Sequence, residues 1–215
     1  MQVCCVNAWD MRAVGECAAE ERADLVVFGG VEQTVCYQRE LQGETRFFQD
    51  ATMLSKRLQS VVVCGCTTDT RGLKRKSAMV AQGGRLLGVS DRVHVLEMQG
   101  NGGAAFRVYD TKIGKMGVVV AEDLLFPDTV KTLALCGSDF IVCTYGKIEN
   151  VHTVVARALA YCYGVPILLC GKGYCLLANE KGKVAFASPL ARVDFSLRTK
   201  PQYQMVQMRR KGSFL

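Results

Sequence analysis

The stretch 115–127 constrains the fold more than any other part of the chain. Gly117 leads into the β-branched run 118–120, the carboxylates Glu122 and Asp123 follow one residue later, and a Phe-Pro pair then opens a helix-like segment. A run of this kind is typical of a central strand that is buried on both faces. Because ligands gather beyond the carboxyl ends of such strands, the sequence predicts that the two carboxylates lie at the rim of a site.

Further apolar runs predict strands, amphipathic stretches predict helices, and glycine-containing turns predict hairpins. The strands are expected at 2–8, 24–28, 61–66, 139–144 and 166–170, the helices at 11–22, 44–59, 128–136 and 150–163, and the hairpins at 77–89, 106–121 and 174–187. Strands and helices that alternate, with hairpins inserted between them, favour an α/β sandwich with mixed sheets over an all-parallel open sheet.

Length and composition indicate one globular domain. The chain has 215 residues, of which 49% are hydrophobic and 22% charged, and that balance is ordinary for a folded protein. No apolar run approaches the roughly 18 residues of a membrane helix, and the first ten residues do not resemble a signal peptide. We therefore expect a cytoplasmic protein with a single domain at 1–195. The residues after Pro189 are less patterned, and 196–215 form a tail that we interpret as an oligomerisation arm.

Cysteine and histidine usage does not favour a metal site. The chain has eleven cysteines and two histidines, His94 and His152. Several of the cysteines lie in apolar runs, where cysteine is usually a small buried hydrophobe. The close pairs, Cys4-Cys5 and Cys64-x-Cys66, lack the spacing of a zinc or redox motif. No glycine-rich phosphate-binding motif follows a strand, so the sequence predicts neither a metal nor a cofactor.

The net charge of +7 raises the question of an acidic partner. Two basic clusters carry much of this charge, Arg71 with 74–76 and the segment 209–211 near the C-terminus. Neither contains the interleaved aromatic residues of a nucleic-acid surface. We interpret the first cluster as a solvated hairpin turn and the second as a solvated tail, so nucleic acid is not an expected partner.

The order of these elements resembles the nitrilase, or carbon-nitrogen hydrolase, superfamily from the N-terminal strand to about Asp194. The matching stretches are 23–28, 83–87, 92–94, 117–128, 134–139, 156–159 and 179–184. The resemblance implies a four-layer α-β-β-α sandwich, pairing into homodimers or larger homo-oligomers, and hydrolysis of amides or nitriles by a Glu-Lys-Cys triad. In such a triad a thiolate attacks, a carboxylate moves the proton and an ammonium stabilises the oxyanion.

The three positions that match the triad carry other residues in this chain. Gly30 stands at the glutamate position, Arg92 at the lysine position and Ala121 at the cysteine position. Arginine keeps the positive charge but does not release its proton, and loss of a nucleophile typically reduces turnover about a millionfold. An engineered change at Ala121 would not account for the other two positions. The resemblance therefore predicts an inactive relative that acts as a ligand-binding, regulatory or scaffold domain.

Two alternatives stay open. The first is an active amidase-like hydrolase with a rearranged site, to which Glu32 or the thiol of Cys143 would contribute. The second is a purely structural subunit, with an apolar interface formed by the helices 128–136 and 150–163. If a pocket persists, a small polar or anionic ligand is expected, and the residues proposed to line it are Gly29, Glu32, Arg92, His94, Glu122, Asp123 and Tyr145.

Overall fold

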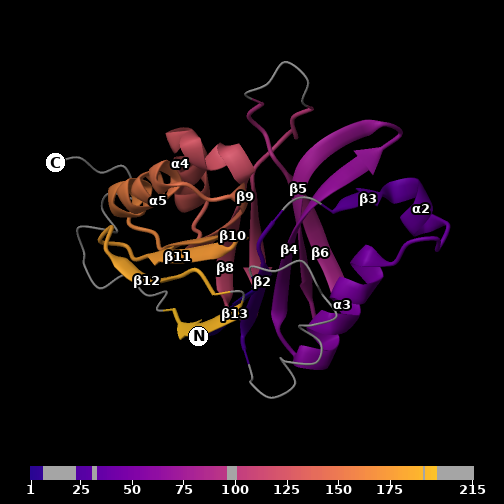
Figure 1. Ribbon diagram of the computed structural model, residues 1–215, viewed down its shortest axis with the longest axis horizontal. Helices are drawn as coiled ribbons and strands as arrows, with labels where there is room; N and C mark the ends of the chain where they lie inside the picture. Colours follow the sequence, from indigo (N-terminus) through magenta and orange to yellow (C-terminus); the bar gives the residue numbers. More distant parts are fainter. Residues whose placement is uncertain (7–22, 31–32, 96–100, 191, 198–215) are drawn as a thin grey trace.

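Two sheets stack face to face and carry helices on their outer faces (Figure 1). The computed structural model describes residues 1–6, 23–30, 33–95, 101–190 and 192–197. The predicted helix at 11–22 and the residue Glu32 lie outside the described residues. No helix of the described part is long and apolar enough to cross a membrane.

The first sheet combines the N-terminal half of the chain with one strand from near its C-terminus. Its order is β13 (Arg192–Ser196), β1 (Gln2–Val6), β2 (Leu25–Phe28), β4 (Val61–Thr70), β5 (Leu73–Gln82) and β6 (Arg85–Asp91), and β3 (Thr34–Cys36) pairs with β4. The strands β1, β2 and β4 are parallel, whereas β13, β5 and β6 pair antiparallel to their neighbours.

The second sheet is built from one continuous part of the chain. Its order is β12 (Val184–Ser188), β11 (Tyr174–Ala178), β10 (Ile167–Lys172), β9 (Phe140–Lys147), β8 (Gly114–Val120) and β7 (Arg107–Thr111). The central strands β8, β9 and β10 are parallel, and hairpins add the strands at either edge. This mixed arrangement confirms the predicted α/β sandwich.

Helices cover the outer face of each sheet, which completes the four layers. The helices are α2 (Tyr37–Leu41), α3 (Phe47–Leu58), α4 (Pro127–Leu135) and α5 (Asn150–Tyr163), with a 3-10 turn, η1 (Ala121–Leu125), directly after β8. One buried cluster lies between α3 and the first sheet, a second between the sheets, and a third between the second sheet and α4 with α5. The continuous apolar runs of the sequence follow from this packing, because the central strands are covered on both faces.

Side chains fix the ends of two helices. At α3 the Glu40 carboxylate accepts hydrogen bonds from the backbone N–H groups of Phe47 and Phe48, at 2.9 and 3.2 Å, so a neighbouring helix caps these otherwise free donors. At α5, Glu149 and His152 form a capping box, with the Glu149 N–H donating to His152 Nδ1 at 2.9 Å. Gly164, in the left-handed conformation (φ 62°), ends that helix.

Three elements differ from the expectations. β3, α2 and β13 were not predicted. β13 includes the first residue of the expected tail 196–215, of which 198–215 lie outside the described residues. The structure pairs β13 with β1 of the same chain. The basic cluster lies at the β4–β5 hairpin, with Arg71 in its exposed turn, but β5 begins at Leu73, so residues 74–76 belong to a strand rather than to the turn.

Candidate functional site

The site is built where β8 ends and the chain turns into η1. Ala121, the first residue of that turn, has a φ of 51° although it is not a glycine, and it is 1% exposed. An L-residue in the left-handed region is strained, and such strain is found preferentially at functional sites. The sharp turn from strand to helix places the residues after Ala121 beyond the sheet edge, where Glu122 and Asp123 both lie.

Side chains alternate between the two faces of a strand, so every second residue of β4 and β5 points toward the second sheet, where this turn lies. Val61 and Val63 of β4, and Ala78 and Val80 of β5, belong to the core between the sheets. Continuing the alternation along β5 brings Lys76 to the same face, beyond the apolar core. Lys76 therefore approaches the end of β8 from the opposite sheet.

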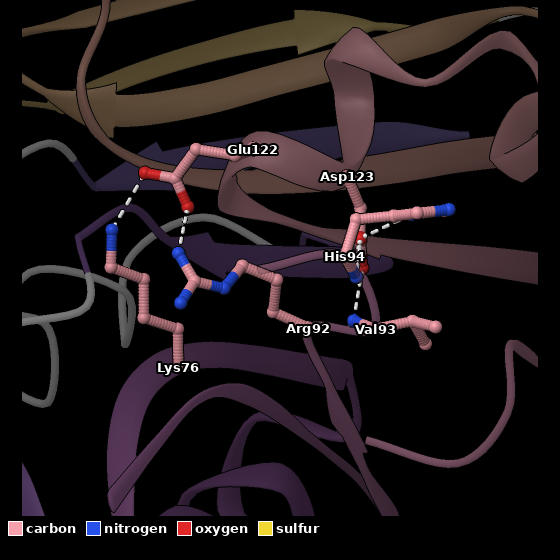
Figure 2. Close-up of polar contacts among 6 residues, drawn as sticks. All are labelled: Lys76, Arg92, Val93, His94, Glu122 and Asp123. Atoms are coloured by element: carbon pink, nitrogen blue, oxygen red, sulfur yellow. Dashed lines mark hydrogen bonds and ion pairs between the residues drawn. The ribbon is translucent and has the colours of Figure 1, made fainter. Parts of the chain in front are cut away.

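Glu122 lies between two cations (Figure 2). Lys76 Nζ donates to Glu122 Oε1 at 2.6 Å, and Arg92 Nη1 donates to Glu122 Oε2 at 2.5 Å. The side chain of Arg92 is only 6% exposed, against 20% for Glu122 and 36% for Lys76. Burial raises the pKa of the Glu122 carboxyl, but the hydrogen bonds from Lys76 and Arg92 outweigh it, so this pKa lies below its ordinary value.

Asp123 has a different set of partners, on the other side of the turn (Figure 2). It accepts hydrogen bonds from the backbone N–H groups of Val93 and His94, at 2.8 and 2.7 Å, and it pairs with His94 Nδ1 at 2.9 Å. The His94 ring stacks on Phe126 with 3.9 Å between ring centroids. Asp123 thus fastens the segment after β6 to the end of β8.

Gly29, one of the residues expected to line a pocket, leaves no open space beside its backbone. A Cβ on Gly29 would lie 2.7 Å from the backbone nitrogen of Gly171, so glycine here permits close contact between the sheets. Gly30 has a φ of 110°, and its carbonyl oxygen would overlap a Cβ placed on Gly65. Gly29 thus permits close contact between the two sheets, whereas Gly65 permits close contact between β4 and the backbone after β2 within the first sheet.

Tyr145 and Cys143 lie on the other face of β9. Both belong to the core between the second sheet and its helices, and the Tyr145 ring packs on His152 with 4.3 Å between centroids. Burial raises the pKa of both the Tyr145 hydroxyl and the Cys143 thiol. Cys143 is fully buried, which makes it a core thiol rather than a reactive one.

Two buried polar atoms near the end of the strands have no hydrogen-bond partner, Arg92 Nε and Thr144 Oγ1. Thr144 pairs with Val120, the residue before Ala121. Among the described residues, no three His, Cys, Asp or Glu side chains are grouped so that they could hold a metal ion.

Lys76 was not predicted as a site residue. Its contact with Glu122 joins positions 46 residues apart, and the only available signal was a basic residue next to a predicted inward-facing strand. The structure brings together Lys76, Arg92, Glu122, Asp123 and His94. It places Tyr145 on the far face of β9.

The fold and the site define a two-sheet α/β sandwich with a strained turn and paired carboxylates at the end of a central strand. A family model described as carbon-nitrogen hydrolase matches residues 7–193. The chain belongs to the carbon-nitrogen hydrolase family.

Solved structures share this fold over most of their length. A mutant of the amidase of Nesterenkonia AN1, from the nitrilase superfamily, matches with a TM-score of 0.78 and 15% identity, over 99% of this chain and 95% of that one. Nit3 of Saccharomyces cerevisiae matches with a TM-score of 0.73 and 17% identity, over 87% and 85%.

Sequence matches to curated relatives are shorter. A probable nitrilase from Schizosaccharomyces pombe is 32% identical over 96 residues, which span 41% of this chain and 35% of that protein. A citrullinase from Francisella tularensis is 32% identical over 73 residues, 30% of this chain and 26% of that protein. The matched part is therefore about a third of each relative or less.

Proposed function

We propose that this chain is a catalytically inactive member of the carbon-nitrogen hydrolase family that acts as a ligand-binding, regulatory or scaffold domain. The observation that carries the proposal is Ala121. The turn after β8 keeps its strained backbone, but the side chain held there is a methyl group, which can neither attack a carbonyl nor carry a proton.

The groups around Ala121 support the same proposal. Arg92 and Lys76 are both engaged by Glu122, and an arginine holds an anion without transferring a proton. Two thiols of the second sheet, Cys143 and Cys170, are fully buried. Cys143 faces the helices, and Cys170 lies on β10, two strands away from β8 in the sheet order.

The ligand that fits this site is small and polar or anionic, because two cationic side chains converge on it. The rearranged amidase remains the competing function. It gains an ammonium from Lys76, which had not been expected at the site, and it would take its acid from Glu32, outside the described residues. It still needs a nucleophile within reach of the space above Ala121.

The test is ammonia release by the purified protein from a panel of primary amides, carbamoyl compounds and nitriles. We expect rates equal to the spontaneous background. Turnover that disappears on changing Lys76, Glu122 or Cys143, but persists in Cys136→Ser, which alters an exposed thiol outside the site, would establish the rearranged hydrolase and overturn the proposal.

A specific observation also favours the scaffold version. Outward-facing apolar residues gather on the outer helix layer: Leu135 of α4 is 55% exposed, and Val151, Val154 and Tyr161 of α5 are 52%, 54% and 49% exposed. Those of α5 follow helical spacing, which is typical of a contact face. We propose that homodimers or larger homo-oligomers form through this face, so Val154→Glu should reduce the mass measured by light scattering. A monomeric wild-type protein would contradict this.

A further inference from the structure

Two kinds of donor converge on the Glu122 carboxylate. They are the Lys76 ammonium at 2.6 Å and the Arg92 guanidinium at 2.5 Å. An ammonium and a guanidinium around one carboxylate form the donor set of an anion site. Here the anion comes from the chain itself.

The donors are held in place independently of Glu122. Lys76 lies on β5, and the backbone N–H of Arg92 donates to the Lys76 carbonyl at 2.8 Å, so the two cations are neighbours at one edge of the first sheet. The segment after Arg92 is fastened by Asp123 through Val93 and His94. Removal of the Glu122 side chain would therefore leave two neighbouring cations with no change in the elements that position them.

The site also has more donors than Glu122 uses. Arg92 Nη1 binds Glu122, while Nε is buried without a partner, and Figure 2 shows Nε and Nη2 on the edge of the guanidinium that faces away from Glu122. That edge is the side-on fork that matches a carboxylate. A buried donor without an acceptor is unfavourable, and Glu122 leaves Nε unpaired because it binds Arg92 only through Nη1.

We propose that Lys76 and Arg92 form, beside the turn after β8, a binding site for small carboxylates, which Glu122 fills in the ligand-free chain as an internal ligand. A carboxylate ligand binds in exchange for the Glu122 side chain and takes over its hydrogen bonds. The inference deepens the proposed function, because it gives the chemical class of the ligand at that site, and it holds whether or not the chain also turns over a substrate.

Because Glu122 is tethered beside its donors, it competes at a high effective concentration, and the wild-type protein should bind formate or acetate only weakly. Glu122→Ala removes the competitor and creates a gap the size of a small carboxylate. In chloride this variant should melt well below the wild type, since Arg92 is left buried without its counter-ion.

The experiment compares melting temperatures in sodium formate or acetate with those in sodium chloride at equal ionic strength. For Glu122→Ala, 100 mM formate should raise the melting temperature by about 3–5 °C over chloride. The wild type should shift by less than about 1 °C. Asp110→Ala is the matched control: it removes an exposed carboxylate paired with Lys115 at 3.8 Å, and it should show no formate-specific shift.

A second pair of variants identifies the donors. Adding Lys76→Met to Glu122→Ala should abolish the formate shift, whereas adding Lys74→Met, an exposed lysine on the same strand, should leave it intact. If Glu122→Ala does not stay folded in chloride, the same comparison is made on its refolding yield in the two salts. Equal effects of formate and chloride on Glu122→Ala, or equal formate shifts in Glu122→Ala and Asp110→Ala, would overturn the proposal. Neither result depends on catalytic activity, so failure here is distinct from failure of the proposed inactivity.

Discussion

Replacing Ala121 by glycine tests whether the turn after β8 is strained. Ala121 has a φ of 51°, a conformation that costs an L-residue about 1–2 kcal/mol and costs glycine almost nothing. The substitution also removes a methyl group that is 1% exposed, whose burial is worth about 0.8 kcal/mol. It also raises the conformational entropy of the unfolded chain, which lowers stability by about 0.4–1 kcal/mol. The gain and the losses nearly cancel, so the free energy of unfolding should change by less than about 1 kcal/mol.

Ala78→Gly is the matched control, because Ala78 is 0% exposed in β5 and its φ is not positive. It removes the same methyl group and raises the conformational entropy of the unfolded chain by the same amount, but it relieves no backbone strain. We expect it to lower the free energy of unfolding by about 1–2 kcal/mol, or the melting temperature by about 3–7 °C. Urea and thermal unfolding measure both variants. If Ala121→Gly is destabilised as much as Ala78→Gly, the turn stores no strain and the reasoning is wrong.

Three further predictions concern the site. Ala121→Cys should not release ammonia from amides or nitriles above background, because the Glu122 carboxylate and the Lys76 ammonium are paired with each other and Gly30 has no side chain to act as a base; steady turnover would contradict this. The pKa of the Glu122 carboxyl is lowered in the folded protein, so its contribution to stability is present above its ordinary pKa of 4.5 and is lost as pH falls through the lower folded value. Below about pH 4.5 the wild type should therefore lose stability more steeply than Glu122→Gln. Parallel pH profiles of the two proteins would refute this. Asp123→Ala removes the acceptor of two backbone N–H groups and the His94 ring, which should cost about 3 kcal/mol or more in urea unfolding, against less than about 0.5 kcal/mol for the exposed Asp110→Ala.

The larger elements were predictable because their causes are local. A strand buried on both faces reads as a continuous apolar run, and the helix Asn150–Tyr163 has its apolar residues at helical spacing and a glycine at its end. β3 and α2 have three and five residues, too few to show a period. β13 pairs with β1 across nearly the whole chain, and that pairing leaves no local pattern.

The site was predictable only in part, because some of its contacts are local in sequence and others join distant segments. Glu122 and Asp123 were placed at the rim because they follow a strand directly. The partner of Glu122, by contrast, depends on the register of β5 and on how the two sheets stack, and Lys76 therefore looked like part of a basic turn. The close contact at Gly29 likewise depends on Gly171 of the opposite sheet.

The two sheets differ in when they can be completed during synthesis. All strands of the second sheet lie between Arg107 and Ser188, so this sheet needs only one uninterrupted stretch of chain. The first sheet waits for its last strand, because β1 pairs with β13 and the Leu197 N–H donates to the Met1 carbonyl at 2.9 Å. Contacts this distant in sequence form slowly. Until residue 196 has left the ribosome, one edge of β1 stays unpaired, and the nascent chain is then most exposed to aggregation through that edge.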